Sequence, residues 1–147
     1  MDATDFKILA CLKENSRMNA TTIGDRINLS TSAVLERIKK LESSNVIVRY
    51  TTVVDNEKIG KGMTVFISVS LEHPKYDEDF RSLMAENDEI VECHYITGDF
   101  DYLIKGITAN STSLEKLINW VKSIQGVSHT KTLVVMTTTK NDFTAVQ

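Results

Sequence analysis

The sequence predicts an α+β protein, in which an N-terminal helix-turn-helix domain, winged-helix-like, precedes a C-terminal ferredoxin-like βαββαβ domain. Three observations predict this class. Apolar residues recur at helical spacing through the first 50 residues, and from residue 63 they alternate with the period of two that marks strands. Charge also divides the chain, because residues 1–50 carry eight Lys and Arg against six Asp and Glu, whereas the remainder carries nine against fourteen. A basic module joined to an acidic one raises the expectation of a polyanionic partner.

Length and composition bound the possibilities further. The chain has 147 residues, of which 41% are hydrophobic and 25% charged, so one average domain or two small ones fit and an enzyme of several domains does not. The apolar runs are shorter than the roughly 20 residues of a membrane span. The acidic start carries no export signal, so a cytoplasmic protein is expected. Cys11 and Cys93 lack the spacing of a zinc site or a disulfide framework and are expected to be buried thiols.

Three short helices are predicted in residues 1–50. The first follows Asp2 as N-cap and ends near residue 15, and the second runs from the cap Asn19 to the turn at residues 28–30. Ser30 caps the third, which ends at Asn45, a residue that tolerates left-handed backbone. The inward side chains are expected to be Phe6, Ile8, Leu9 and Leu12 in the first helix, Ile23 and Ile27 in the second, and Val34, Ile38 and Leu41 in the third.

The second and third helices have the pattern of a DNA-reading pair. A tight turn joins them, Gly24 permits a close approach between them, and the third helix carries small polar residues near its start with bases farther along. We expect Arg37 to reach a guanine edge or the adjoining phosphate. The alternative from periodicity alone is an ordinary three-helix cap with a solvated charged face. The candidate DNA-binding residues are Arg17, Thr31, Ser32, Ala33, Glu36, Arg37, Lys39 and Lys40, of which Arg17, Lys39 and Lys40 are expected on the backbone.

A connecting segment separates the two parts. Residues 47–54 are rich in β-branched side chains and predict a strand, and the polar, glycine-bearing residues 55–62 predict a linker. The expected domains are therefore 1–50, the connecting strand and linker 51–62, and 63–147.

Residues 63–147 alternate between strand and helix patterns. Strands are predicted at 63–71, 90–97, 102–108 and 129–138, with helices after residue 77 and after residue 110. This order places both helices on one face of a four-stranded antiparallel sheet. The other face then needs a partner, for which a second copy in a two-fold dimer is the simplest. Its apolar side chains are expected to be Phe66, Tyr95 or Ile96, Leu103, and Leu133 or Val134.

Specific motifs in the expected order carry a resemblance to a known family. The chain resembles the Lrp/AsnC family, the leucine- and asparagine-responsive regulators of bacteria and archaea, over essentially its whole length. Gly24, where the family usually has alanine, and Asn45, where glycine is common, are departures. The matching residues are Met1-Asp2, Asp5, Ile8-Leu9, Leu12, Arg17, Leu29-Ser30, Ser32, Val34, Arg37-Ile38, Leu41-Glu42, Val46-Ile47, Glu92-Cys93-His94, Gly98 to Leu103, Lys105, Gly126-Val127, Thr130, Thr132 and Val134-Val135-Met136.

The resemblance implies a dimeric DNA-binding regulator. Its sheet domain, often called RAM, would assemble dimers into larger rings, an octamer being favoured, and would bind a small effector, typically an amino acid. Glycine lets the hairpin backbone approach a ligand carboxylate, Asp99 or Asp101 can meet the ammonium, and Leu133 and Val134 of the same or a neighbouring subunit can form the wall. The alternative from the residues alone is a tight turn capped by Asp101. The candidate effector residues are Gly98, Asp99, Phe100, Asp101, Tyr102, Thr132, Leu133 and Val134.

Nothing in the sequence indicates an enzyme, a metal or a cofactor. His73, His94 and His129 lie on three separate elements, and no nucleophile, metal or phosphate-loop motif is present. The expected function is a sequence-specific DNA-binding transcriptional regulator, modulated by an amino-acid effector. The alternative is an amino-acid-sensing oligomer that acts through protein contacts without specific DNA binding.

Overall fold

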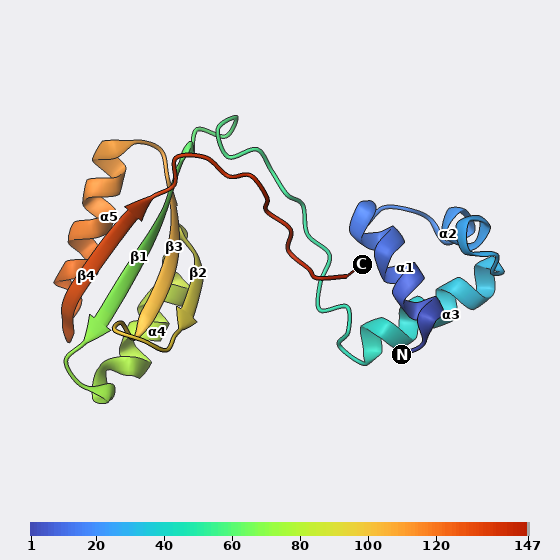
Figure 1. Cartoon of the computed structure of the whole chain (residues 1–147), viewed down its shortest axis with the longest axis horizontal. Helices are drawn as coiled ribbons and strands as arrows, with labels where there is room; N and C mark the ends of the chain where they lie inside the picture. The colour runs from blue at the N-terminus through green and yellow to red at the C-terminus, as the bar shows by residue number, and fades with distance from the viewer. Residues whose placement is uncertain (147) are drawn as a thin grey trace. The chain divides into compact units, whose positions relative to one another are not determined.

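The computed structural model describes residues 1–146. It divides into two compact units, each treated by itself below. A helical unit comprises Met1–Val53 with the last residues of the chain from Lys140, and a sheet unit comprises Val54–Thr139 (Figure 1). Lys13 in the helical unit lies 3.5 Å from the Asp142 carboxylate of the C-terminal segment.

The helical unit contains the three predicted helices. They are α1 (Ala3–Glu14), α2 (Ala20–Ile27) and α3 (Thr31–Ser43), and the predicted N-caps Asp2, Asn19 and Ser30 are confirmed, since each side chain accepts a backbone N–H of the first turn. Phe6 was expected to face inward and is instead 49% exposed, because the inward stripe of α1 runs through Ile8 and Cys11. The core residues are Ile8, Cys11, Ile23, Val34 and Leu41.

The turn between α2 and α3 explains Gly24. Asn28 adopts the left-handed conformation with φ 56°, and the Leu29 N–H donates to the Gly24 carbonyl over 2.9 Å. A Cβ at position 24 would overlap the Leu29 carbonyl oxygen. The tight contact at Gly24 is therefore with the backbone of the turn and not, as predicted, with α3 itself.

The connecting strand predicted at residues 47–54 is wrong. The segment is irregular and no described residue pairs with it, so the β-branched side chains of Val48 and Val53 stay exposed at 80% and 63%. A strand requires a partner ladder, which a β-branched composition does not supply. Tyr50 anchors the segment to the end of α3, because its hydroxyl donates to Glu42 over 2.9 Å. Partial burial and this hydrogen bond raise the pKa of Tyr50 to about 12.

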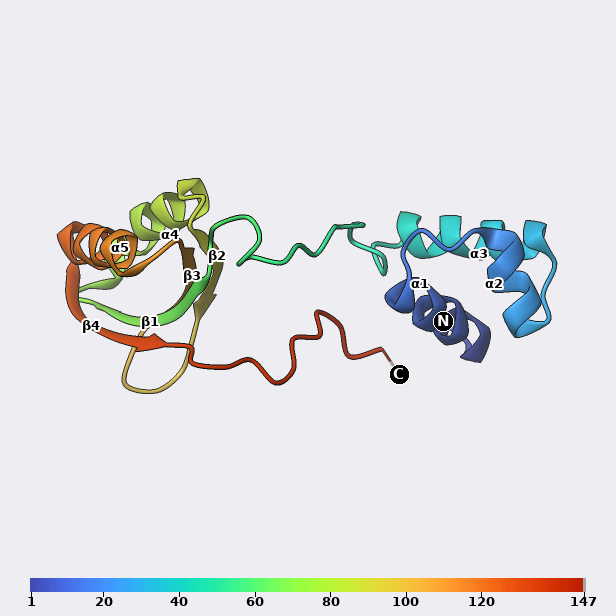
Figure 2. The ribbon, with the colours of Figure 1, turned by 90° about the horizontal axis from the view of Figure 1, so that it is seen from above.

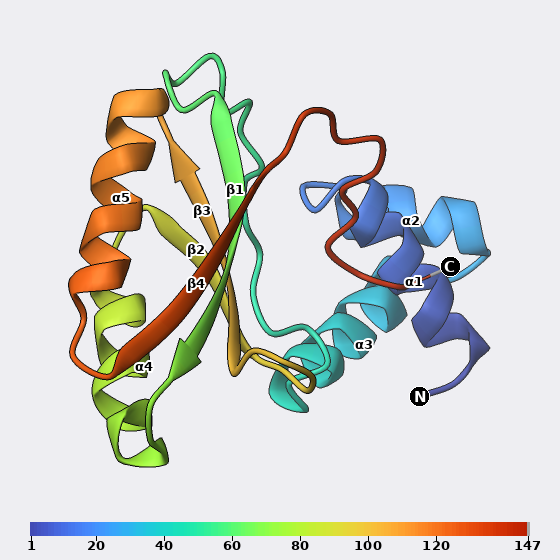
Figure 3. The ribbon, with the colours of Figure 1, turned by 60° about the vertical axis from the view of Figure 1, so that its left-hand side comes forward.

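The sheet unit has the predicted βαββαβ order. The strands are β1 (Met63–Leu71), β2 (Ile90–Tyr95), β3 (Tyr102–Thr108) and β4 (Val127–Val134), in the all-antiparallel order β2-β3-β1-β4. The helices α4 (Asp77–Glu86), entered through the 3₁₀ turn Pro74–Tyr76, and α5 (Ser111–Ser123) cover one face, as Figures 2 and 3 show. The fold class is confirmed.

Two strands differ from the prediction in their bounds. The strand expected at 129–138 runs from Val127 to Val134, and the one expected at 90–97 ends at Tyr95. The backbone hydrogen bonds between β1 and the end of β4 stop where the Val135 N–H donates to the Thr64 carbonyl, one residue from the start of β1. Among the described residues, none pairs with the β-branched residues that follow.

The core lies between the sheet and its helices. Val65, Ile67 and Val69 of β1 alternate inward, and α5 packs so close to β3 that a Cβ on Gly106 would press on the Leu117 side chain. The fully enclosed cluster also holds Phe80, Met84, Tyr102, Ile104 and Val121.

The strand register shows which of the alternative residues lie on the uncovered face of the sheet. Residues paired across strands share a face, and Phe66 pairs with Leu133, so Leu133 and not Val134 lies on the uncovered side. Tyr95 pairs with Tyr102, and their rings pack with centroids 5.4 Å apart on the helix side, so Tyr95 does not lie on the uncovered face. The face carries Phe66, Leu103 and Leu133 together with charged residues, among them Glu92 and Lys105 in an ion pair of 3.0 Å.

Candidate DNA-reading helix and effector hairpin

One stripe of α3 is directed away from the helical core. Val34 and Leu41 are buried, and the opposite positions, one turn apart, hold the exposed Ser32, Glu36 and Lys39. A short polar stripe with a base at its end is what entry into a DNA groove requires, since small side chains permit approach and lysine meets phosphate.

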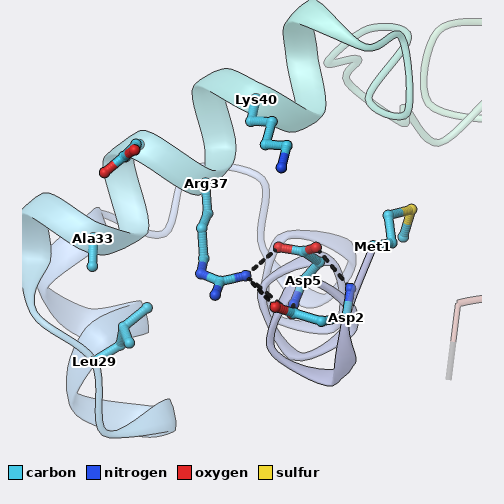
Figure 4. Close-up of a pocket in the computed structure, with 8 residues that line it drawn as sticks. Met1, Asp2, Asp5, Leu29, Ala33, Arg37 and Lys40 are labelled. Carbon is cyan, nitrogen blue, oxygen red and sulfur yellow. Dashed lines mark hydrogen bonds and ion pairs between the residues drawn. The ribbon is translucent and has the colours of Figure 1, made fainter.

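A flank of α3 faces the start of α1. Ala33, Arg37 and Lys40 border a shallow hollow of about 530 Å³ whose other side is formed by Met1, Asp2 and Asp5 (Figure 4). Ala33 and Lys40 therefore sit at the edge of the outward stripe, beside a group of acids.

Arg37 is engaged within the protein. Its Nη1 donates to both carboxylate oxygens of Asp2 at 3.0 and 2.8 Å and to Oδ1 of Asp5 at 2.8 Å (Figure 4). The two acids also cap α1 reciprocally, each accepting the backbone N–H of the other over 2.9 Å. These backbone bonds, then Arg37, lower the pKa of both carboxyls.

The remaining predicted DNA contacts lie at the ends of the helix pair. Arg17 is exposed in the turn between α1 and α2, and Thr31 is exposed at the first position of α3. The Thr31 hydroxyl bonds that of Thr21 in α2 over 3.2 Å. Leu35, which is not among the predicted contacts, is 55% exposed beside the polar stripe.

The hairpin between β2 and β3 contains an open glycine, an exposed aspartate and a second aspartate held by structural hydrogen bonds. Gly98 has φ 110° with nothing within 4 Å of where its Cβ would lie, and Asp99 is exposed. The Asp101 carboxylate accepts the backbone N–H of Leu71 over 2.7 Å, and the Asp101 N–H donates to the Val69 carbonyl over 3.0 Å. Asp101 therefore stabilises the turn, whereas Asp99 keeps its carboxylate toward solvent.

The other candidate effector residues are distributed over the sheet. Tyr102 is 1% exposed in the core, where its hydroxyl accepts from the Arg81 Nε over 2.7 Å, so its ring does not line the hairpin surface. Phe100 stacks on His129 with ring centroids 5.7 Å apart, which makes His129 the β4 residue next to the hairpin. His129 was missed because the sequence does not give the β1–β4 register.

Thr132, Leu133 and Val134 lie farther along β4. They pair with Ile67, Phe66 and Val65, whereas His129 pairs with Ser70 near the hairpin. At about 3.3 Å per strand residue, Leu133 is roughly 13 Å from His129 along β4. A single chain thus does not bring the hairpin and these three residues together.

The described residues hold few other groups with site chemistry. Among them there is no cluster of three or more potential metal ligands, and no helix is long and apolar enough to cross a membrane. A shallow hollow of about 320 Å³ lies at the α5–β4 connection, lined by Lys122 and residues 127–130. Both cysteines are free, and Cys93 is exposed and not buried as expected, because β2 is an edge strand with a neighbour on one side only.

Family models match both units of the chain. Residues 1–42 match the AsnC-type helix-turn-helix domain and residues 64–145 match the Lrp/AsnC ligand binding domain. The chain belongs to the Lrp/AsnC family. The predicted family is therefore confirmed, and so is the function as a helix-turn-helix, DNA-binding transcriptional regulator with a ligand-binding domain. Lrp/AsnC proteins are transcriptional regulators, and the chain is not an enzyme.

Curated Lrp/AsnC relatives are similar over most of their length. The HTH-type transcriptional regulator FL11 of Pyrococcus horikoshii is 36% identical over 140 residues, which cover 95% of this chain and 92% of the relative. The leucine-responsive regulatory protein of Haemophilus influenzae is 34% identical, covering 92% and 84%.

Solved Lrp/AsnC structures share the fold. A transcriptional regulator of Neisseria meningitidis in complex with L-Met superposes with a TM-score of 0.94 at 28% identity, covering 97% of this chain and 94% of that one. LrpC of B. subtilis gives a TM-score of 0.87, also at 28% identity, covering 95% and 97%.

Proposed function

We propose that this regulator docks α3 in the major groove of specific operators and that an amino acid bound by the sheet unit changes its assembly or its DNA affinity. The proposed division is residues 1–50 for DNA binding, 51–62 for the connection and 63–147 for effector binding and assembly, of which Gln147 lies outside the described residues. The protein would act in the cytoplasm.

The outward stripe of α3 is the observation that carries this proposal. Ser32 and Glu36 are exposed one turn apart on a helix that follows a tight turn, in a domain of helix-turn-helix type. We assign sequence preference to Ser32, Ala33 and Glu36, and phosphate contact to Arg17, Lys39 and Lys40, with Thr31 at the N-terminal end of α3. Arg37 lies on the neighbouring flank of α3, where its side chain meets Asp2 and Asp5.

The effector is proposed to be an apolar amino acid. Relatives are named leucine-responsive regulators, and one structural neighbour holds L-Met. The exposed Asp99 would meet the ammonium, and backbone amides beside Gly98 would meet the carboxylate, with Phe100 as part of the apolar wall. Because Thr132, Leu133 and Val134 lie away from the hairpin of their own chain, we place their contribution on a neighbouring subunit, while Asp101 and Tyr102 hold the hairpin in shape.

Assembly is proposed to begin on the uncovered face of the sheet. Phe66, Leu103 and Leu133 form an apolar strip there that a second copy would cover in a two-fold dimer, and dimers would join into a larger ring, with an octamer favoured.

Selection of DNA from a random pool, followed by binding measurements, tests the proposal. The full chain should enrich a related set of duplexes and lose affinity steeply as salt rises. Leucine or methionine should change the affinity or the oligomer size, whereas glutamate should not. Failure to enrich any sequence would instead favour a sensor that acts through protein contacts, and indifference to all twenty amino acids would refute the effector role.

A further inference from the structure

The Arg37 guanidinium joins two elements that are distant in the sequence. Arg37 lies in the middle of α3, and its carboxylate partners Asp2 and Asp5 form the N-terminal capping box of α1 (Figure 4). The side chain therefore points from the proposed DNA-reading helix toward a neighbouring helix, not along the outward stripe.

The helix cap holds both carboxylates in place independently of Arg37. Each accepts the backbone N–H of the other residue, so their rotamers are already determined by the helix cap. Asp5 is the more enclosed anchor, with a side chain 14% exposed against 56% for Asp2. A bond to a fixed, partly enclosed carboxylate costs less side-chain entropy than an ordinary surface ion pair.

The charge balance opposes release of Arg37 to a DNA base. Asp2, Asp5 and Arg37 together carry a net charge of −1, because two carboxylates share one guanidinium. If Arg37 turned outward, both carboxylates would lose the one cation that is hydrogen-bonded to them among the described residues, on the helix proposed to approach DNA phosphates, which is electrostatically unfavourable.

We infer that Arg37 is a positioning residue, which sets the orientation of α3 on α1 through Asp5 and Asp2 and thereby determines how the outward stripe meets the bases. This inference rests on the proposed docking of α3 in the groove. A base reader at position 37 would act by itself, whereas a positioning residue acts only while its carboxylate partner is present.

A double-mutant cycle on the full chain separates the two roles. The variants are Arg37→Gln, Asp5→Asn and their combination, and the probes are a duplex enriched by the unmodified protein and a scrambled duplex of the same composition. The readout is the discrimination ratio, the dissociation constant for the scrambled duplex divided by that for the enriched duplex, measured over a range of salt. A positioning role predicts that each single change lowers the ratio about tenfold, the effect of a coupling of ordinary size, and that the double change lowers it no further.

The salt dependence and a conservative variant give independent readouts. Arg37→Gln should leave the salt slope unchanged, because a positioning residue neutralises no phosphate. Arg37→Lys should restore part of the discrimination, since an ammonium can pair with one carboxylate at a time. If Asp5→Asn instead keeps or raises discrimination while Arg37→Gln lowers it, or if Arg37→Gln lowers the slope by about one, Arg37 contacts DNA and the inference is wrong.

A second ion pair in the same unit controls for stability. Arg26 Nη1 meets the Glu14 carboxylate at 2.7 Å, away from the hollow beside α3. Arg26→Gln and Glu14→Gln should leave the discrimination ratio unchanged. An equal loss in these variants would show a general effect of destabilisation and would overturn the positioning role. If the unmodified protein enriches no duplex, the proposed function itself fails; enrichment with additive effects of Arg37→Gln and Asp5→Asn overturns the positioning role alone.

Discussion

The carboxylate of Asp101 accepts a hydrogen bond from the backbone N–H of Leu71 over 2.7 Å, which ties the hairpin after β2 to the end of β1. The backbone of Asp101 is paired as well, with Val69 and Ile96. The proposed effector hairpin thus contains one aspartate with a structural role and one, Asp99, whose carboxylate is exposed.

Asp101→Ala is expected to destabilise the sheet unit by about 1–3 kcal/mol, the cost of removing a charged acceptor from a partly buried N–H. Asp99→Ala should leave the thermal unfolding midpoint unchanged and abolish the response to the amino-acid effector. Thermal denaturation of both variants measures the midpoints, and DNA affinity with and without the amino acid measures the response. An unchanged midpoint for Asp101→Ala would show that its hydrogen bond contributes nothing to the fold.

Gly126→Ala should lower the free energy of unfolding by at least about 2 kcal/mol. Gly126 has φ 90°, and an added Cβ would overlap the Tyr76 ring, so backbone strain and crowding act together. Gly60→Ala is the matched control, because Gly60 has φ 76° with nothing within 4 Å of its Cβ position and should suffer strain alone, about 1 kcal/mol. Equal losses in chemical denaturation would contradict the crowding at Gly126.

Leu103→Asp should weaken assembly of the full chain, because it places a charge in the apolar strip of the uncovered sheet face. Leu83→Asp, on the helix side at 37% exposure, is the matched control and should preserve the dimer. Sedimentation velocity measures both.

The fragment 63–147 should likewise dimerise without the helical unit, and residues 1–50 should be monomeric. A monomeric fragment 63–147 at micromolar concentration would remove the assembly role from this face.

Stability of the helical unit should fall in acid. The pKa values of Asp2 and Asp5 in the folded chain lie below the unfolded reference of 3.8, because the helix cap and Arg37 favour the ionised forms. A depressed folded pKa stabilises the fold above the unfolded value, and this contribution is lost as pH falls through the folded pKa. Circular dichroism melts from about pH 6 downward should show a smaller acid-induced loss for Asp5→Asn than for the unmodified chain. Equal losses would mean that this carboxyl is not stabilised in its ionised form.

Local signals made much of the fold predictable. Asp2, Asn19 and Ser30 cap helices through atoms three residues away, so the sequence alone predicts those helix starts. The segment at 47–54 shows the limit of such signals, since β-branched composition predicts a strand only where a partner is available. The sequence also left Leu133 and Val134 as alternatives, because the β1–β4 register decides which face each takes.

The candidate sites were predictable in part. The exposed stripe of Ser32, Glu36 and Lys39 follows from helical periodicity. Arg37 was expected to meet DNA, but its carboxylate partners lie more than 30 residues earlier in the chain and only the packing of α3 on α1 brings them together. The stacking of Phe100 on His129 likewise depends on pairing between strands distant in sequence.

The salt dependence of DNA binding by Lys40→Ala tests the orientation of α3 most directly. Lys40 lies at the edge of the outward stripe, where it should neutralise one phosphate. The variant should weaken binding to the enriched and scrambled duplexes alike and reduce the slope of log affinity against log salt by about one, while Ser32→Ala changes the preference between sequences. Unchanged affinity and slope for Lys40→Ala would contradict the assigned orientation of α3 on DNA.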